Sequence, residues 1–138
     1  MKKNTSTLLA QLGDKKSSYW TRDREKSALK LFHDAAERVP AYKDFLRKNE
    51  IQHEKIKSFK DFQNVPFTSK SNYLREYPLE ALCWNGDLSS PLVFTSTSGS
   101  TGTPFYFCRD SGLDWQYSVI QEYFFQRRNT NGSTLVIV

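Results

Sequence analysis

The chain has 138 residues, of which 38% are hydrophobic and 14% aromatic, and this is enough apolar material for one packed domain. This composition excludes global disorder, and the sequence contains no apolar run long enough to predict a membrane-spanning helix. The net charge of +5 comes from basic residues interspersed with acidic ones, as in residues 22–26. Such mixing is typical of a solvated helical surface and argues against a nucleic-acid-binding stripe, so nucleic-acid binding is the weakest interpretation.

The cysteines and histidines do not form a recognisable site in the sequence. Cys83 and Cys108 are far apart and have no evident activating neighbour, and neither His33 nor His53 stands at metal-ligand spacing from them. We therefore expect two thiols in a reducing compartment and no metal site. The apolar segment after the basic N-terminus is too short for a signal peptide, so we expect a cytoplasmic protein.

The first half of the chain predicts a series of short helices over residues 21–78, after a flexible or weakly helical lead at residues 1–20. From Arg22 the apolar positions recur at steps of three and four, which predicts an amphipathic helix that ends at Pro40. These apolar positions are Ala28, Leu31, Phe32, Ala35, Ala36 and Val39. A second short helix is expected over residues 41–48.

Two serines are expected to cap further short segments. Ser58 and Asp61 have the spacing of a capping box, with Asp in place of the usual Glu, and predict a helix of one or two turns. Ser69 is expected to cap a helix over residues 70–77. A proline follows each of these segments and limits its length.

The second half changes character and predicts strand, loop, strand, helix and strand over residues 91–138. Residues 92–95 and 105–107 have strand propensity, and almost every residue between them is Ser, Thr or Gly. Asp110 or Ser111 is then expected to cap a longer helix. The apolar residues that recur at helical spacing in it are Leu113, Tyr117, Ile120 and Phe124.

Residues 135–138 are a β-branched apolar run of the kind found in parallel sheets that are covered on both faces. A buried strand needs neighbouring strands and covering helices, and no residues follow this one to supply them. We therefore expect an incomplete α/β domain, α+β within the present residues. The excess of aromatic residues also indicates apolar surface that faces something else.

The segment Thr97–Pro104 has a composition suited to wrapping a polyphosphate. Gly99 and Gly102 allow positive φ and a close backbone approach, so that successive N–H groups can point at an anion. Side-chain hydroxyl donors come from Thr97, Ser98, Ser100 and Thr101. The segment is not a Walker A loop, because it lacks the lysine and runs into a strand. A flexible Ser/Gly linker is the structural alternative.

The run Thr97-Ser98-Gly99-Ser100-Thr101-Gly102-Thr103-Pro104 resembles the phosphate-binding signature of the adenylate-forming superfamily. The chain is most similar to the phenylacetate-coenzyme A ligase branch, which includes relatives from capsular polysaccharide biosynthesis. The resemblance extends upstream through residues 39–42, 61–67, 68–70 and 75–78, which follow in the order of that branch. Many ligases carry lysine before the loop proline, whereas this chain has Thr103, and this departure puts the substrate in doubt.

The resemblance implies that residues 21–138 are part of the N-terminal domain of an ATP-dependent carboxylate-activating ligase. Such an enzyme forms an acyl-adenylate and then transfers the acyl group to coenzyme A or another acceptor, here in a polysaccharide or aryl-acid pathway. The resemblance implies ATP and Mg²⁺ as cofactors and Thr97 to Thr103 as the nucleotide-binding residues. Lys70 is added only by its place in the family pattern, because a lone lysine after a cap is more often solvated.

No catalytic residue is assigned, because the resemblance places the rest of the active site after residue 138. The chain alone is therefore expected to be inactive, and the remainder of the enzyme as a separate chain is one candidate partner. Nucleotide and a small carboxylate are the expected ligands of the full-length protein. The alternative interpretation is a non-enzymatic binding or scaffolding module derived from this fold.

Overall fold

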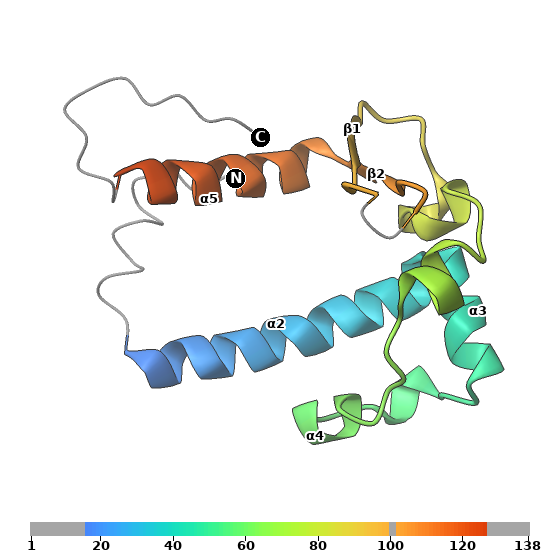
Figure 1. Ribbon diagram of the computed structural model, residues 1–138. Helices are drawn as coiled ribbons and strands as arrows, with labels where there is room; N and C mark the ends of the chain where they lie inside the picture. The colour runs from blue at the N-terminus through green and yellow to red at the C-terminus, as the bar shows by residue number, and fades with distance from the viewer. Residues whose placement is uncertain (1–15, 100–101, 127–138) are drawn as a thin grey trace. The chain divides into compact units, whose positions relative to one another are not determined.

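The computed structural model describes residues 16–99 and 102–126, with backbone only at residues 125–126. The chain divides into two compact units, which are treated separately. The first, residues 15–90, is called the helical unit, and the described part of the second, residues 91–99 and 102–126, is called the hairpin unit. Their α-helices and strands are labelled in Figure 1.

The helical unit consists of one long helix followed by six short helical segments. The long helix α2 covers Ser17–Arg38, and α3 covers Pro40–Lys48 beside its C-terminal end (Figure 1). The shorter segments are the 3-10 turn η1 His53–Lys55, the helix α4 Phe59–Phe62, the π-helical turn η2 Lys70–Leu74 and the 3-10 turns η3 Glu80–Leu82 and η4 Trp84–Gly86. Helix α2 begins at Ser17, within the lead predicted for residues 1–20, whereas residues 1–15 lie outside the described part.

The junction between α2 and α3 follows from one proline. Val39 is extended, with φ −102° and ψ 108°, which is the conformation that a residue before proline prefers. Pro40 then occupies the first position of α3, where its missing N–H group costs no hydrogen bond. The predicted break between two helices is therefore confirmed, and Pro40 begins the second helix as well as ending the first.

The hydrophobic core of the helical unit is largely aromatic. Phe32 lies edge-on to Phe62, with ring centroids 5.4 Å apart, and Phe45 packs against Tyr73 at the same 5.4 Å. The buried cluster comprises Phe32, Ala36, Ala41, Phe45, Leu46, Val65 and Tyr73. Leu31, which the helical spacing assigns to the same stripe of α2, is 58% exposed. Burial raises the pKa of Tyr73 to about 12.

The two predicted caps are present, and one predicted helix is shorter than expected. The Ser58 hydroxyl accepts the Asp61 N–H at 3.2 Å, while the Asp61 carboxylate accepts the Ser58 N–H at 2.8 Å, a complete capping box. Ser69 forms the same reciprocal pair with Asn72. The prediction of a helix to residue 77 was wrong, because the π-helical turn ends at Leu74.

A polar network ties α3 to the segment that follows η2. The Asp44 carboxylate is 2.6 Å from Arg47 Nη2 and 2.8 Å from Lys48 Nζ, and it accepts a 2.8 Å hydrogen bond from the Tyr77 hydroxyl. These hydrogen bonds, with Lys48 first and then Arg47 and Tyr77, hold the pKa of Asp44 far below its usual range. The bond from Tyr77 spans 33 residues of sequence and so fixes tertiary structure.

The hairpin unit is a two-stranded antiparallel sheet followed by one helix. Strand β1, Val93–Ser96, pairs with β2, Tyr106–Arg109, in the register Val93↔Arg109 to Ser96↔Tyr106. Both strands lie one or two residues later than the propensity predicts. The described residues thus combine helices with a small antiparallel sheet, an α+β arrangement. The strand predicted at residues 135–138 lies outside the described part.

Helix α5 covers Ser111–Gln126 and begins as predicted after Asp110, whose carboxylate accepts the Leu113 N–H at 2.7 Å. The stripe that helical spacing would assign to a buried face is instead exposed, at 48% for Leu113 and 62% for Phe124. Among the described residues, no helix is long and apolar enough to cross a membrane.

Candidate functional site

The predicted phosphate loop joins the two strands of the hairpin, and it is closed at its base by two hydrogen bonds. The Thr97 N–H donates to the Phe105 carbonyl at 3.0 Å, and the Phe105 N–H donates to Thr97 Oγ1, also at 3.0 Å. The Thr97 side chain therefore extends the pairing of the two strands by one more hydrogen bond. Its hydroxyl accepts a structural bond and keeps its own proton to donate.

Both loop glycines adopt conformations that other residues avoid. Gly99 has φ +69° and Gly102 has φ +118°, and the Gly102 N–H donates to the Gly99 carbonyl at 2.8 Å. This bond occupies the Gly102 N–H group, which is therefore not free to bind an anion in this arrangement.

The two glycines differ in what surrounds them. A Cβ placed on Gly99 would lie 2.9 Å from Pro104 Cγ and 3.0 Å from the Gly102 carbonyl oxygen. A Cβ placed on Gly102 would meet no atom within 4 Å among the described residues. Gly99 is thus packed against Pro104, whereas the space beside Gly102 is open to an approaching group.

The structure describes only some of the predicted binding residues. Thr97, Ser98, Gly99, Gly102 and Thr103 are described, whereas Ser100 and Thr101 lie outside the described residues. Ser98 and Thr103 take part in interactions within the structure.

Lys70, the additional candidate, is exposed and is the first residue of η2 in the helical unit. Its carbonyl oxygen accepts the Arg75 N–H at 3.0 Å, which is a backbone role. The loop belongs to the hairpin unit, so a role for Lys70 beside the loop stays a prediction.

An arginine that sequence reasoning did not single out lies at the opposite end of the hairpin from the loop. Arg109 Nη2 is 3.1 Å from Asp114 Oδ1, and the guanidinium stands over the Tyr117 ring at 4.7 Å from its centroid. The Nε atom of Arg109 is buried and has no hydrogen-bond partner in the described structure. These contacts of Arg109 link β2 to α5. No local spacing in the sequence predicts them.

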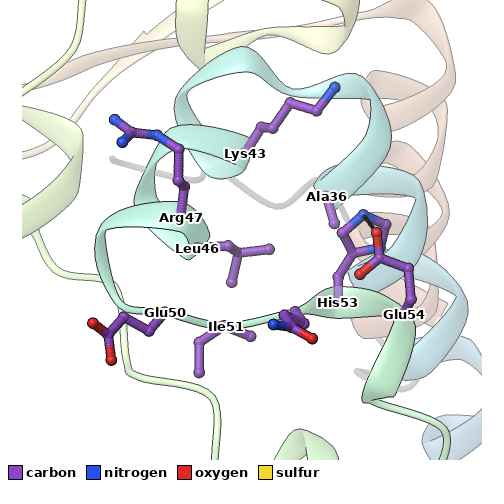
Figure 2. A pocket seen from close by; sticks show the side chains of 9 residues that line it. Ala36, Lys43, Leu46, Arg47, Glu50, Ile51, His53 and Glu54 are labelled. Atoms are coloured by element: carbon purple, nitrogen blue, oxygen red, sulfur yellow. Dashed lines mark ion pairs between the residues drawn. The ribbon is translucent and has the colours of Figure 1, made fainter.

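The helical unit contains a surface cavity of about 700 Å³, shown in Figure 2. Lys43, Leu46 and Arg47 line it from α3, and Glu50 to Glu54 come from the segment that follows (Figure 2). Its charged lining residues are exposed, and its apolar lining consists of buried Leu46 and Ala36 with half-buried Ile51. None of the predicted nucleotide-binding residues lines this cavity.

The two histidines, which are 20 residues apart in sequence, lie side by side, with ring centroids 6.2 Å apart. His33 in α2 is half-buried, and its Nε2–H donates to the Ile56 carbonyl at 2.9 Å. His53 Nε2 is 3.2 Å from Glu54 Oε1. Within residues 16–99 and 102–126, no group of three or more His, Cys, Asp or Glu side chains could hold a metal ion.

Comparison with known proteins adds no relative. No family model matches the chain, and no curated protein or solved structure matches it. The loop and its surroundings are therefore the ground for a functional proposal.

Proposed function

We propose that this chain is the N-terminal part of an ATP-dependent, carboxylate-activating ligase of the cytoplasm. In this proposal the loop Thr97 to Thr103 holds the β- and γ-phosphates of ATP. The observation that carries the proposal is the pair of loop glycines: both have positive φ, Gly99 is packed against Pro104, and the space beside Gly102 is open. The resemblance of the loop sequence to the adenylate-forming signature supplies the reaction.

In this proposal the loop stabilises negative charge on the phosphates electrostatically. When ATP and Mg²⁺ are bound, the α-phosphorus is attacked by a carboxylate and pyrophosphate leaves, so negative charge accumulates on the β- and γ-phosphates. Hydroxyl and N–H donors stabilise such charge without becoming charged themselves. Thr97 positions the loop by its bond to Phe105, and the open side at Gly102 admits the phosphate.

The proposal is tested by nucleotide titration of the ¹⁵N-labelled 138-residue chain. Mg²⁺ with ATP or pyrophosphate should shift the amide resonances of residues 97–103, whereas AMP, which lacks both outer phosphates, should not. A Gly102→Val variant, which fills the open side, should abolish the response, and Lys60→Ala in the helical unit should retain it. Equal shifts with AMP, or no loop response at millimolar ATP, would contradict the assignment.

Adenylation is a separate measurement. We expect the chain alone to release no pyrophosphate above background with ATP, Mg²⁺ and a panel of carboxylates, because no residue for the chemical step is assigned in it. Pyrophosphate release from the purified chain would show that the active site is more complete than proposed.

A second candidate function, a binding or scaffolding module, is favoured by one observation. The hairpin unit exposes eight large apolar side chains: Val93, Phe94, Tyr106, Phe107, Leu113, Tyr117, Ile120 and Phe124. Exposed apolar surface of this extent marks interaction sites.

A further inference from the structure

The cavity of the helical unit has an apolar floor with charged side chains around it. Buried Ala36 and Leu46 and half-buried Ile51 form the apolar part of its lining. In Figure 2 Leu46 lies between Lys43 on one side and Glu50 on the other. A volume of about 700 Å³ is within the range of small-molecule sites, which combine apolar walls with a few polar groups.

The turn that ends α3 places Glu50 in a conformation that a glutamate adopts at a cost. The Ile51 N–H donates to the Leu46 carbonyl at 2.9 Å, and the Glu50 N–H donates to the Arg47 carbonyl at 3.1 Å, which is the Schellman pattern of a helix end. Glu50 has φ +58° at the position of this motif that glycine or asparagine usually occupies. Because glycine would suit the turn better, the glutamate is explained by what its carboxylate does.

The interactions around the cavity leave one charge of each sign without a partner. Arg47 pairs with Asp44 at 2.6 Å, so its charge is compensated within α3. Among the described residues, neither Lys43 nor Glu50 forms an ion pair or a side-chain hydrogen bond. They are seven residues apart, which is roughly 10 Å along a helix. Both side chains are long enough to reach one small ligand between them.

We propose that this cavity binds a zwitterionic small molecule with an apolar body, of the class of the aliphatic α-amino acids. The carboxylate of the ligand faces Lys43, its ammonium group faces Glu50, and its aliphatic side chain covers the apolar floor. A simple carboxylate would pair with Lys43 but leave Glu50 unpaired, and a simple amine would do the reverse. The inference does not depend on nucleotide binding, because no residue of the phosphate loop lines this cavity.

The test is a titration of the full ¹⁵N-labelled 138-residue chain with L-leucine. The amide resonances of residues 43–54 should shift and saturate. Three analogues each lack one part of the ligand: 4-methylpentanoate has no ammonium group, 3-methylbutylamine has no carboxylate, and glycine has no aliphatic side chain. Each analogue should have a dissociation constant at least about threefold higher than that of L-leucine. No saturable shift with L-leucine, or equal binding of any analogue, would overturn the proposal.

Charge-removing variants identify the two residues that hold the ligand. Lys43→Met and Glu50→Gln should each raise the dissociation constant of L-leucine at least about threefold. Lys55→Met and Glu76→Gln make the same changes at exposed positions of the helical unit outside the cavity lining, and they should leave the constant unchanged. Equal weakening by the lining and control variants would mean a general effect of net charge and would overturn the assignment.

Glu50→Gly separates binding from stability. Glycine adopts the left-handed conformation without the cost that a Cβ imposes, so the melting temperature should rise. The carboxylate is lost, so binding of L-leucine should weaken as it does in Glu50→Gln. Unchanged binding, or a lower melting temperature, would overturn the role assigned to Glu50.

Discussion

Gly99 and Pro104 are packed so closely that the loop has no room for a side chain at position 99: a Cβ there would lie 2.9 Å from Pro104 Cγ. Gly99 also has φ +69°, so conformation and contact both demand glycine. The Pro104 ring therefore packs directly against the backbone of Gly99 and restricts position 99 to glycine.

This relationship predicts a coupling between the two positions. Gly99→Ala should destabilise the loop by about 1–2 kcal/mol from the left-handed conformation alone, and by more because of the clash. The same substitution in a Pro104→Ala background should cost less, since the nearest atom, Pro104 Cγ, is removed and only the Gly102 carbonyl oxygen at 3.0 Å remains. Hydrogen exchange of the Thr97 amide, which is bonded to Phe105, measures the opening of the loop. Strictly additive effects would contradict the contact.

We expect the Thr97 hydroxyl to stabilise the closed base of the loop. Thr97→Val removes the acceptor of the Phe105 N–H and should cost about 1 kcal/mol, seen as faster exchange of the Phe105 amide. Thr97→Ser keeps the oxygen and should exchange like the wild type. If the Phe105 amide exchanges as slowly in Thr97→Val as in the wild type, the 3.0 Å hydrogen bond contributes nothing to the stability of the loop.

The Asp44 network predicts loss of stability in acid. Hydrogen bonds from Lys48, Arg47 and Tyr77 lower the pKa of Asp44 in the folded state below the value of about 4 expected for an unfolded chain. The stabilisation from Asp44 is therefore present above pH 4 and is lost as pH falls below it. Asp44→Asn should lower the melting temperature at pH 7, and the difference from wild type should shrink as pH falls from 5 to 2. A constant difference would show that the carboxylate charge is not involved.

The raised pKa of Tyr73 predicts loss of stability in base. Burial raises its pKa to about 12 in the folded state, against about 10 when unfolded. The unfolded chain therefore loses this proton first, and stability should fall between about pH 10 and pH 12. Tyr73→Phe has no proton to lose, so its stability should fall less over that range. Tyr106→Phe, at an exposed ring of the hairpin unit, is the control and should keep the wild-type loss of stability over that range.

Local features of the fold could be read from the sequence because each depends on a few neighbouring residues. The capping box needs only Ser58 and Asp61, three residues apart, and the helix break needs only Pro40 and the residue before it. The strands on either side of the loop follow from β-branched and aromatic residues in short runs. The same local evidence predicted glycine conformations at Gly99 and Gly102 that the structure contains.

What the sequence could not determine depends on residues that meet only after the chain has folded. Three contacts join positions that share no local sequence pattern. They are the hydrogen bond from Tyr77 to Asp44, the contact between the rings of His33 and His53, and the stacking of the Arg109 guanidinium on Tyr117. Helical periodicity identified the apolar stripe of α5, because periodicity depends only on spacing. Tertiary structure alone decided that this stripe is exposed, because burial depends on which elements pack against a helix.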